Sequence, residues 1–404
     1  MSLEKPKRSN DGLKNSAAIL AVAFAGFSTF LDLYATQPLL PRFTEIFHAS
    51  KAEVGLTVSA PTAAVALCAP IFGAIGDRFS RTRLMIASLA FLSLTTLLAA
   101  TSTGLGSLIV WRFLQGAATP GVYVLALAYL AEEIDVSLVG RAMAAFVTGN
   151  VIGGWAGRSI TGWIAQHTHW PFAFIVLGLL NGIGAFVTWK FLPPSRVRGG
   201  GATPLPLGRR IVGLATPALL ANFAIGFNVL FSLVAVFSYV GFYLTASPFK
   251  LATGSLSTIY AVYLVGAFVT PIAGRFIDRV GSRRVLVGSL GIGALGLMLT
   301  LIPFLPAVVA GLAVCCSSAF VCQSASTTRL RSAAPPGLRS LASGAYVTCY
   351  YLGGSVGGIA PGLTWKYGGW AGCVALVVIV ELMTMGLATY FWSEARTAKL
   401  DASA

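Results

Sequence analysis

Long apolar runs alternate with short polar segments along the whole chain. Twelve runs are each about 20 residues or slightly longer, the length that an α-helix needs to cross the hydrocarbon core of a bilayer. They cover 17–40, 54–75, 84–103, 106–130, 142–165, 171–192, 215–245, 253–274, 285–304, 306–328, 341–365 and 370–392. The pattern predicts an all-α membrane protein with twelve transmembrane helices.

The longest polar connection divides these runs into two groups of six. It carries four arginines among glycines and prolines, which is typical of a linker. We therefore expect a cytoplasmic N-terminal tail, a first six-helix half, a cytoplasmic basic linker, a second six-helix half and a cytoplasmic C-terminal tail, at 1–16, 17–192, 193–214, 215–392 and 393–404.

Composition agrees with a chain that mostly faces lipid. Apolar residues make up 56% and charged residues 10% of the 404 positions, whereas a soluble domain has about a quarter of its residues charged. The six cysteines lie inside apolar runs, without histidines at metal-ligand spacing. We interpret them as small core residues rather than as disulfides or metal ligands, and we expect no cofactor or metal.

The basic residues separate by side of the membrane. Most of the 28 lysines and arginines fall in alternate connections, on the side of the N-terminus. The exceptions are four residues in the other connections and two inside runs: Arg42, Lys51, Lys250, Lys366, Arg112 and Arg158. Cytoplasmic loops carry the excess of basic residues, so both termini are expected in the cytoplasm. The net charge of +15 is therefore a topology signal, and no nucleic-acid partner is expected.

One polar loop occurs twice, about two hundred residues apart. Each copy opens with a glycine, continues with an Asp-Arg pair and closes with further arginines. The key residues are Gly73, Asp77, Arg78 and Arg81 in the first copy, and Gly274, Asp278, Arg279 and Arg283 in the second. Two glycine-rich stretches, 149–162 and 350–362, repeat at the same offset. The chain is thus predicted to contain two structural repeats. The glycines favour close helix packing, with a sliding surface between the halves as the alternative.

Four ionisable residues lie inside predicted spans: Asp32, Arg112, Arg158 and Glu381. Such groups are energetically unfavourable in a membrane and indicate function by default. At a rise of 1.5 Å per residue, the first three share a level about 10 Å below the outer surface. Asp32 with Arg112 is a candidate proton-coupling pair; a permanent structural ion pair is the alternative. Arg158 has two open roles, in a cavity or reaching the outer interface.

Further polar and aromatic residues of the spans are candidates for a substrate cavity. With Arg158, the set is Tyr34, Gln37, Gln115, Tyr123, Asn222 and Asn228. Other tyrosines, including Tyr260 and Tyr263, could contribute, although aromatic residues near span ends often anchor a helix at the interface.

With these motifs, the chain resembles the major facilitator superfamily over nearly its whole length. The loop 73–84 is similar to that family's most diagnostic motif, and 274–285 to its second-half copy. The stretch 112–116 resembles the fourth-helix motif of proton-coupled members, and 33–41 the first helix of bacterial drug/proton antiporters and arabinose-efflux-like permeases. The chain departs from the pattern at Ser80, where the motif usually has glycine, so the first turn is expected to differ from the second. The fifth helix also lacks the Gly-Pro of antiporters.

The resemblance implies a carrier whose two pseudo-symmetric halves enclose a central cavity lined by the first, fourth, seventh and tenth helices. Asp32 and Arg112 would then lie on that cavity. The repeated loop would be a conformational latch: Asp77, ordered by Arg81, would accept hydrogen bonds from the start of the eleventh helix near 340–343. Asp278 would act in the same way against the fifth helix near Arg141.

The sequence therefore predicts a secondary active transporter that works by alternating access in a bacterial inner membrane. We expect proton-coupled efflux of a small amphipathic or aromatic compound, by a monomer whose partners are the substrate, protons and the lipid bilayer. Uptake of a small organic anion or sugar-like solute with a proton is the alternative, and a non-translocating receptor is the alternative of another class. An enzyme is not expected, because the three histidines lie outside the spans and no nucleophile–base pair occurs.

Overall fold

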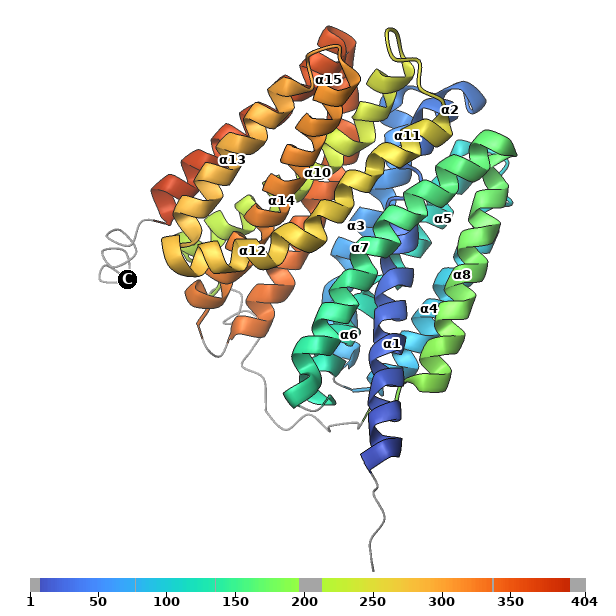
Figure 1. The fold of residues 1–404 in the computed structure, drawn as a ribbon, viewed down its shortest axis with the longest axis vertical. Helices are drawn as coiled ribbons and strands as arrows, with labels where there is room; N and C mark the ends of the chain where they lie inside the picture. The colour runs from blue at the N-terminus through green and yellow to red at the C-terminus, as the bar shows by residue number, and fades with distance from the viewer. Residues whose placement is uncertain (1–7, 77, 135, 196–212, 336–337, 393–404) are drawn as a thin grey trace, which may run out of the picture.

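The computed structural model describes residues 8–76, 78–134, 136–195, 213–335 and 338–392 (Figure 1). All regular structure in these ranges is helical, and each of the twelve predicted spans falls on helices. Ten helical stretches are long and apolar enough to cross a membrane. One of them, Leu341–Phe391, is broken at Gly368 and Gly369 and holds the last two predicted spans. The fifth predicted span lies in α7. The prediction of an all-α fold is confirmed.

The first half runs from α1 to α8. Its elements are α1 (Arg8–Leu33), η1 (Gln37–Leu39), α2 (Leu40–Ile46), α3 (Lys51–Gly76), α4 (Arg81–Ala99), α5 (Leu105–Ala118), α6 (Pro120–Glu132), α7 (Val136–His167) and α8 (Trp170–Phe191). The first predicted span is interrupted before Pro38, and the fourth is divided between α5 and α6 at Pro120. Proline cannot donate the backbone hydrogen bond that would continue a helix, so both interruptions are encoded locally.

The second half runs from α10 to α15. Its elements are α10 (Pro217–Thr245), α11 (Thr253–Ile259), η2 (Tyr260–Leu264), α12 (Val265–Val280), α13 (Ser282–Leu299), α14 (Leu305–Ala333) and α15 (Arg339–Phe391). We call the end of the molecule where α8 finishes and α10 begins the linker end, and the opposite end the far end. In Figure 1 the two halves stand side by side, with α2 and α11 at the far end.

The glycine-rich stretches pack helices within each half. A side-chain carbon at Gly153 would lie 2.1 Å from the carbonyl oxygen of Phe27 on α1. At Gly353 it would lie 1.9 Å from the carbonyl oxygen of Phe227 on α10. Because both members of the second pair are offset by 200 residues from the first, the two halves use one helix contact twice. Only glycine allows the backbones to approach this closely.

Contacts between the halves begin at the far end and continue along α3 and α15. Gly55 of α3 and Gly358 of α15 bring their backbones together, since a side-chain carbon at Gly55 would lie 2.1 Å from the Gly358 carbonyl oxygen. One turn away, Ser59 and Ser355 each donate to the other's carbonyl oxygen, at 2.5 and 3.0 Å. One face of the glycine-rich segment of α15 therefore also serves the interface between the halves.

The two copies of the repeated loop turn differently. Gly281, between α12 and α13, has φ +90°, a conformation that favours glycine. Ser80, which precedes α4, has φ −60° and ψ 115°. The expectation that the first turn differs is confirmed, since a serine there avoids the left-handed conformation that Gly281 adopts.

Candidate functional site

Asp32 lies inside the first half, in the last two turns of α1. It is 1% exposed, and its Oδ2 accepts hydrogen bonds from Thr96 of α4, at 2.8 Å, and from Asn181 of α8. Its Oδ1 has no hydrogen-bond partner among the described residues. The resemblance implied a place on a central cavity, but the carboxyl group is instead enclosed by three helices of one half.

Arg112 of α5 ties α1, α3 and α5 together through backbone oxygens. Its Nε donates to the carbonyl of Thr57 at 2.9 Å, its Nη1 to that of Asp32 at 2.8 Å and its Nη2 to that of Leu33 at 2.7 Å. Thr57 needs such a donor because Pro61, four residues on, has no N–H. Leu33 ends α1, and the amide of Gln37 bonds to Tyr34 instead. The guanidinium thus supplies a donor to the carbonyls of Thr57 and Leu33, as the membrane interior requires, and a second donor to that of Asp32, which also accepts from the Ala35 amide at 3.0 Å.

Asp32 and Arg112 are connected through two intervening side chains rather than as an ion pair. Gln115 accepts from Arg112 Nη1 at 2.5 Å and donates from Nε2 to the Thr96 hydroxyl at 3.1 Å. That hydroxyl is the group that bonds to Asp32. Gln115, a predicted cavity residue, is therefore 1% exposed inside this network. Within the described ranges, the only ion pair between side chains joins Arg81 and Glu132.

Arg158 occupies the boundary between the two halves. It projects from α7, is 1% exposed, and its guanidinium carbon lies 4.9 Å from the ring centre of Tyr34 in its own half. From the second half, the ring centres of Tyr260 and Tyr263 lie 5.6 and 4.1 Å away, both in η2. Such distances are those of cation–π contacts. Arg158 therefore does not reach the outer interface but is enclosed by aromatic rings.

The Arg158 guanidinium is incompletely satisfied. Its Nε donates to Gln37 Oε1 at 2.6 Å and its Nη1 to the carbonyl of Gly154 at 2.5 Å, whereas Nη2 has no hydrogen-bond partner among the described residues. Gln37 in turn donates to the Ser238 hydroxyl of α10 at 3.1 Å, which links the halves. No carboxylate of the described chain lies within ion-pair distance of Arg158. We call Tyr34, Gln37, Arg158, Tyr260 and Tyr263 the arginine cage.

The remaining predicted cavity residues lie elsewhere. The ring of Tyr123 packs against Phe146 within the first half, with centres 5.8 Å apart. Asn228 donates to Thr384 at 2.8 Å, and Asn222 accepts from Ser326 at 3.3 Å, both within the second half. Sequence reasoning missed the buried stack of Tyr346 and Tyr350, whose ring centres are 6.0 Å apart. The four-residue spacing of these tyrosines just before the second glycine stretch was the available signal.

Between described residues, no hydrogen bond or ion pair joins a predicted latch residue to the other half. Asp77 lies outside the described residues. Arg81 pairs with Glu132 of α6 at 2.9 Å, within its own half. Gly73 and Gly274 have no heavy atom within 4 Å of an added side-chain carbon, so neither is needed for close packing. The linker end of α3 is also open to its surroundings, with Ile71 54% exposed.

Glu381 occupies the position in the second half that Asn181 has in the first, at the common offset of 200 residues. It is 4% exposed, and its Oε2 has no hydrogen-bond partner among the described residues. Among the described residues, each half therefore buries one carboxyl group, on α1 in the first and on α15 in the second.

Comparison with known proteins agrees with this architecture. The profile of the Major Facilitator Superfamily matches residues 22–358 and 218–404. The uncharacterized MFS-type transporter YybF of Bacillus subtilis is 32% identical over 378 residues, covering 93% of each chain. The inner membrane transport protein YnfM of Escherichia coli is 31% identical, covering 90% of this chain and 88% of that protein.

Two solved structures share the fold. An inward-facing, unoccupied bacterial homologue of the human lysosomal transporter Spinster has a TM-score of 0.80 at 14% identity, covering 94% of this chain and 97% of the other. The human organic anion transporter MFSD10 has a TM-score of 0.71 at 17% identity, covering 95% and 100%.

The bond between Arg112 and the Thr57 carbonyl gives a testable coupling. Arg112→Met should destabilise the protein by about 1–3 kcal/mol for each carbonyl left unpaired. Pro61→Ala restores a backbone N–H that can reach Thr57, so the Arg112→Met penalty should shrink by about 1 kcal/mol in that background. Thermal unfolding of both single variants and the double variant in detergent measures this difference. Strictly additive effects would show that Arg112 does not serve the carbonyl that Pro61 releases.

Proposed function

Because the chain belongs to the major facilitator superfamily, and is therefore a secondary transporter of the membrane and not an enzyme, we propose that it carries a small organic anion through the arginine cage. The observation that carries the proposal is the unpaired Nη2 of Arg158, buried where the two halves meet and without a carboxylate partner in the described chain. A buried charge without a partner is energetically unfavourable. A carboxylate of the substrate would supply the missing partner through charge-assisted hydrogen bonds.

The tyrosines define the rest of the proposed substrate. Tyr34 is 7% and Tyr263 8% exposed, so both rings reach the edge of the buried cage. Aromatic faces favour an apolar or aromatic body attached to the carboxylate. Because Arg158 and Tyr263 come from different halves, the substrate would contact both halves at once, which is what alternating access requires.

The tyrosines also support a second candidate, the proton-driven export of an aromatic compound that carries no negative charge. In this case the rings would supply the binding energy and Arg158 would keep its cation–π partners throughout. The two candidates differ in their dependence on the substrate's charge. They share a place in a bacterial inner membrane with both chain ends in the cytoplasm, supported by the charge asymmetry of the loops, and both are compatible with a monomer.

Arg158→Gln separates the candidates. Purified protein is heated with matched pairs of aromatic carboxylates and their neutral amides, such as benzoate and benzamide, because a ligand of the folded state raises stability. The wild type should be stabilised by carboxylates and not by amides. Arg158→Gln should weaken carboxylate binding at least tenfold, as expected for loss of a bond worth about 1.5–3 kcal/mol. Arg158→Lys, the control, should keep part of it. Equal stabilisation by amides, unchanged in Arg158→Gln, would favour the uncharged substrate.

Asp32 is the group that we propose to carry the coupled proton. Its free Oδ1 can hold the proton while Oδ2 keeps its bonds from Thr96 and Asn181. Arg112 would sense this change through Gln115 and move the end of α1, which leads directly to Tyr34 and Gln37 of the cage.

Asp32→Asn should therefore uncouple transport from protons. In liposomes, a pH gradient should no longer concentrate the carboxylate that stabilises the protein best, while exchange of that carboxylate without a gradient persists. Glu381→Gln serves as the matched control for loss of a buried carboxyl group and should keep the gradient-driven phase. Gradient-driven accumulation that survives in Asp32→Asn would exclude the role given to Asp32.

The repeated loop remains our proposal for a latch at the linker end. The far end is where the halves meet in this structure, so the latch would engage in the alternative state. Asp77→Asn and Asp278→Asn should leave carboxylate stabilisation unchanged and slow exchange in liposomes by about fivefold, as expected for a contact worth about 1 kcal/mol. Loss of ligand binding in either variant would instead assign the loop to the substrate site.

A further inference from the structure

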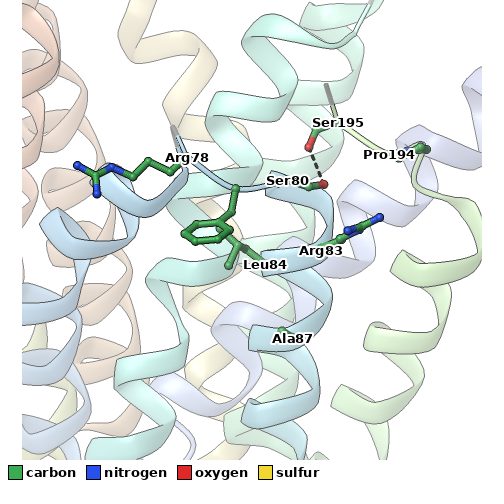
Figure 2. A pocket seen from close by; sticks show the side chains of 8 residues that line it. Arg78, Ser80, Arg83, Leu84, Ala87, Pro194 and Ser195 are labelled. Atoms are coloured by element: carbon green, nitrogen blue, oxygen red, sulfur yellow. Dashed lines mark hydrogen bonds between the residues drawn. The ribbon is translucent and has the colours of Figure 1, made fainter. Parts of the chain in front are cut away.

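A shallow pocket of about 460 Å³ lies on the outside of the first half, at its linker end (Figure 2). It forms where α3 ends, α4 begins and the chain leaves α8. Two arginines, two serines and four apolar residues line it: Arg78, Arg83, Ser80, Ser195, Phe79, Leu84, Ala87 and Pro194. It is remote from the arginine cage, which lies where the two halves meet.

Hydrogen bonds fix the polar wall of the pocket. The Ser80 and Ser195 hydroxyls are 3.1 Å apart, as the dashed line in Figure 2 shows. Behind them, the amide of Ser195 donates to the Thr82 hydroxyl at 3.0 Å, and the Thr82 hydroxyl donates to the carbonyl of Pro193 at 2.9 Å. The segment after α8 is therefore attached to the start of α4, and the pocket has a defined shape.

The two pocket arginines carry positive charge that the described chain does not neutralise. Of the three arginines in this loop, Arg81 turns inward and pairs with Glu132. Arg78 and Arg83 are exposed, and no carboxylate of the described residues lies within ion-pair distance of either. Guanidinium groups suit phosphate oxygens because they present several donors in one plane. The charge and the hydroxyls together favour a phosphate-bearing anion.

The apolar side of the pocket indicates where that anion comes from. Phe79 is 60% exposed beside the arginines. One turn before the pocket, Trp189 of α8 is 65% exposed, and the neighbouring Lys190 Nζ lies 5.4 Å from the ring centre of Phe191. Exposed tryptophan beside a lysine that extends along aromatic surface is typical of the boundary between hydrocarbon and headgroups. A ligand here would meet cations at one end and apolar side chains at the other.

We propose that this pocket binds the phosphate headgroup of an anionic phospholipid. The two arginines and the serine hydroxyls contact the phosphate, while Phe79 and Leu84 pack against the first carbons of the acyl chains. The excess of basic residues in the loops at this end attracts anionic lipids to the same surface.

Lipid binding to the full chain in detergent tests the proposal, by native mass spectrometry and thermal unfolding with added phosphatidylglycerol, phosphatidylcholine or inorganic phosphate. The wild type should prefer phosphatidylglycerol to phosphatidylcholine. Arg83→Gln should weaken that binding about fivefold, and Arg78→Gln with Arg83→Gln about 25-fold. Arg284→Gln, at the corresponding place in the second loop, should change it less than twofold.

Three results would overturn the proposal. Equal binding of phosphatidylglycerol and phosphatidylcholine would exclude selection by charge. Stabilisation by inorganic phosphate as large as that by phosphatidylglycerol would make the pocket a site for a free anion. Equal losses in Arg83→Gln and Arg284→Gln would show that only net charge matters.

A second variant, Ala87→Phe, fills the apolar side of the pocket without changing its charge. It should weaken lipid binding while the unfolding temperature without lipid stays unchanged.

Discussion

The carbonyl oxygen of Thr57 has no donor in its own helix, because Pro61 stands where the next turn would supply one. In a membrane, water cannot replace that donor, so a side chain must. Arg112 supplies it and also holds the end of α1. Together with the Thr36 hydroxyl, which also donates to the Thr57 carbonyl at 3.4 Å, this guanidinium ties the end of α1 to α3 and α5. Asp32 in the last turn of α1, and Tyr34 and Gln37 in the segment that follows α1, all lie next to this interaction.

The fold could be predicted from the sequence because the main constraint that a bilayer places on a chain, the length of its apolar segments, is visible as hydropathy. Run length predicts each span, and the recurrence of the glycine stretches at an offset of 200 predicts equivalent contacts, as Gly153 with Phe27 and Gly353 with Phe227 confirm. That Asp32, Arg112 and Arg158 lie near one another along the helix axes was also predictable. Arg112 bonds to the carbonyl of Asp32, and Arg158 bonds to Gln37 one turn further along, so the three charges do lie close to one level.

The position of a residue along a helix does not predict toward which neighbouring helix its side chain points. Asp32 and Arg112 were expected to face a common cavity, yet Asp32 turns toward α4 and α8, and Arg112 toward backbone oxygens. The sequence leaves two directions open for Arg158, toward the outer interface or into a cavity. Its direction is set by Tyr260 and Tyr263, about a hundred residues away, at a point where α11 gives way to η2. No local pattern near Arg158 contains that information.

The internal repeat shows why the chemistry is concentrated on one side. The offset of 200 residues that relates the glycine contacts also relates Arg158 to Gly358. In the second half, Gly358 lets the backbone of α15 approach that of α3 at Gly55, and the hydroxyls of Ser59 and Ser355 add hydrogen bonds beside this contact. In the first half, the equivalent place on α7 carries Arg158, whose guanidinium packs against the η2 rings and whose Nη2 has no hydrogen-bond partner among the described residues. One of two equivalent contacts between the halves is thus closed by packing, and the other contains an unsatisfied charge. Part of the proposed binding site belongs to each half, so a ligand bound there would have different affinities for states in which the halves are arranged differently. A ligand shifts a conformational equilibrium only through such a difference in affinity. A ligand that completes the second contact would therefore change the stability of the state with a closed far end.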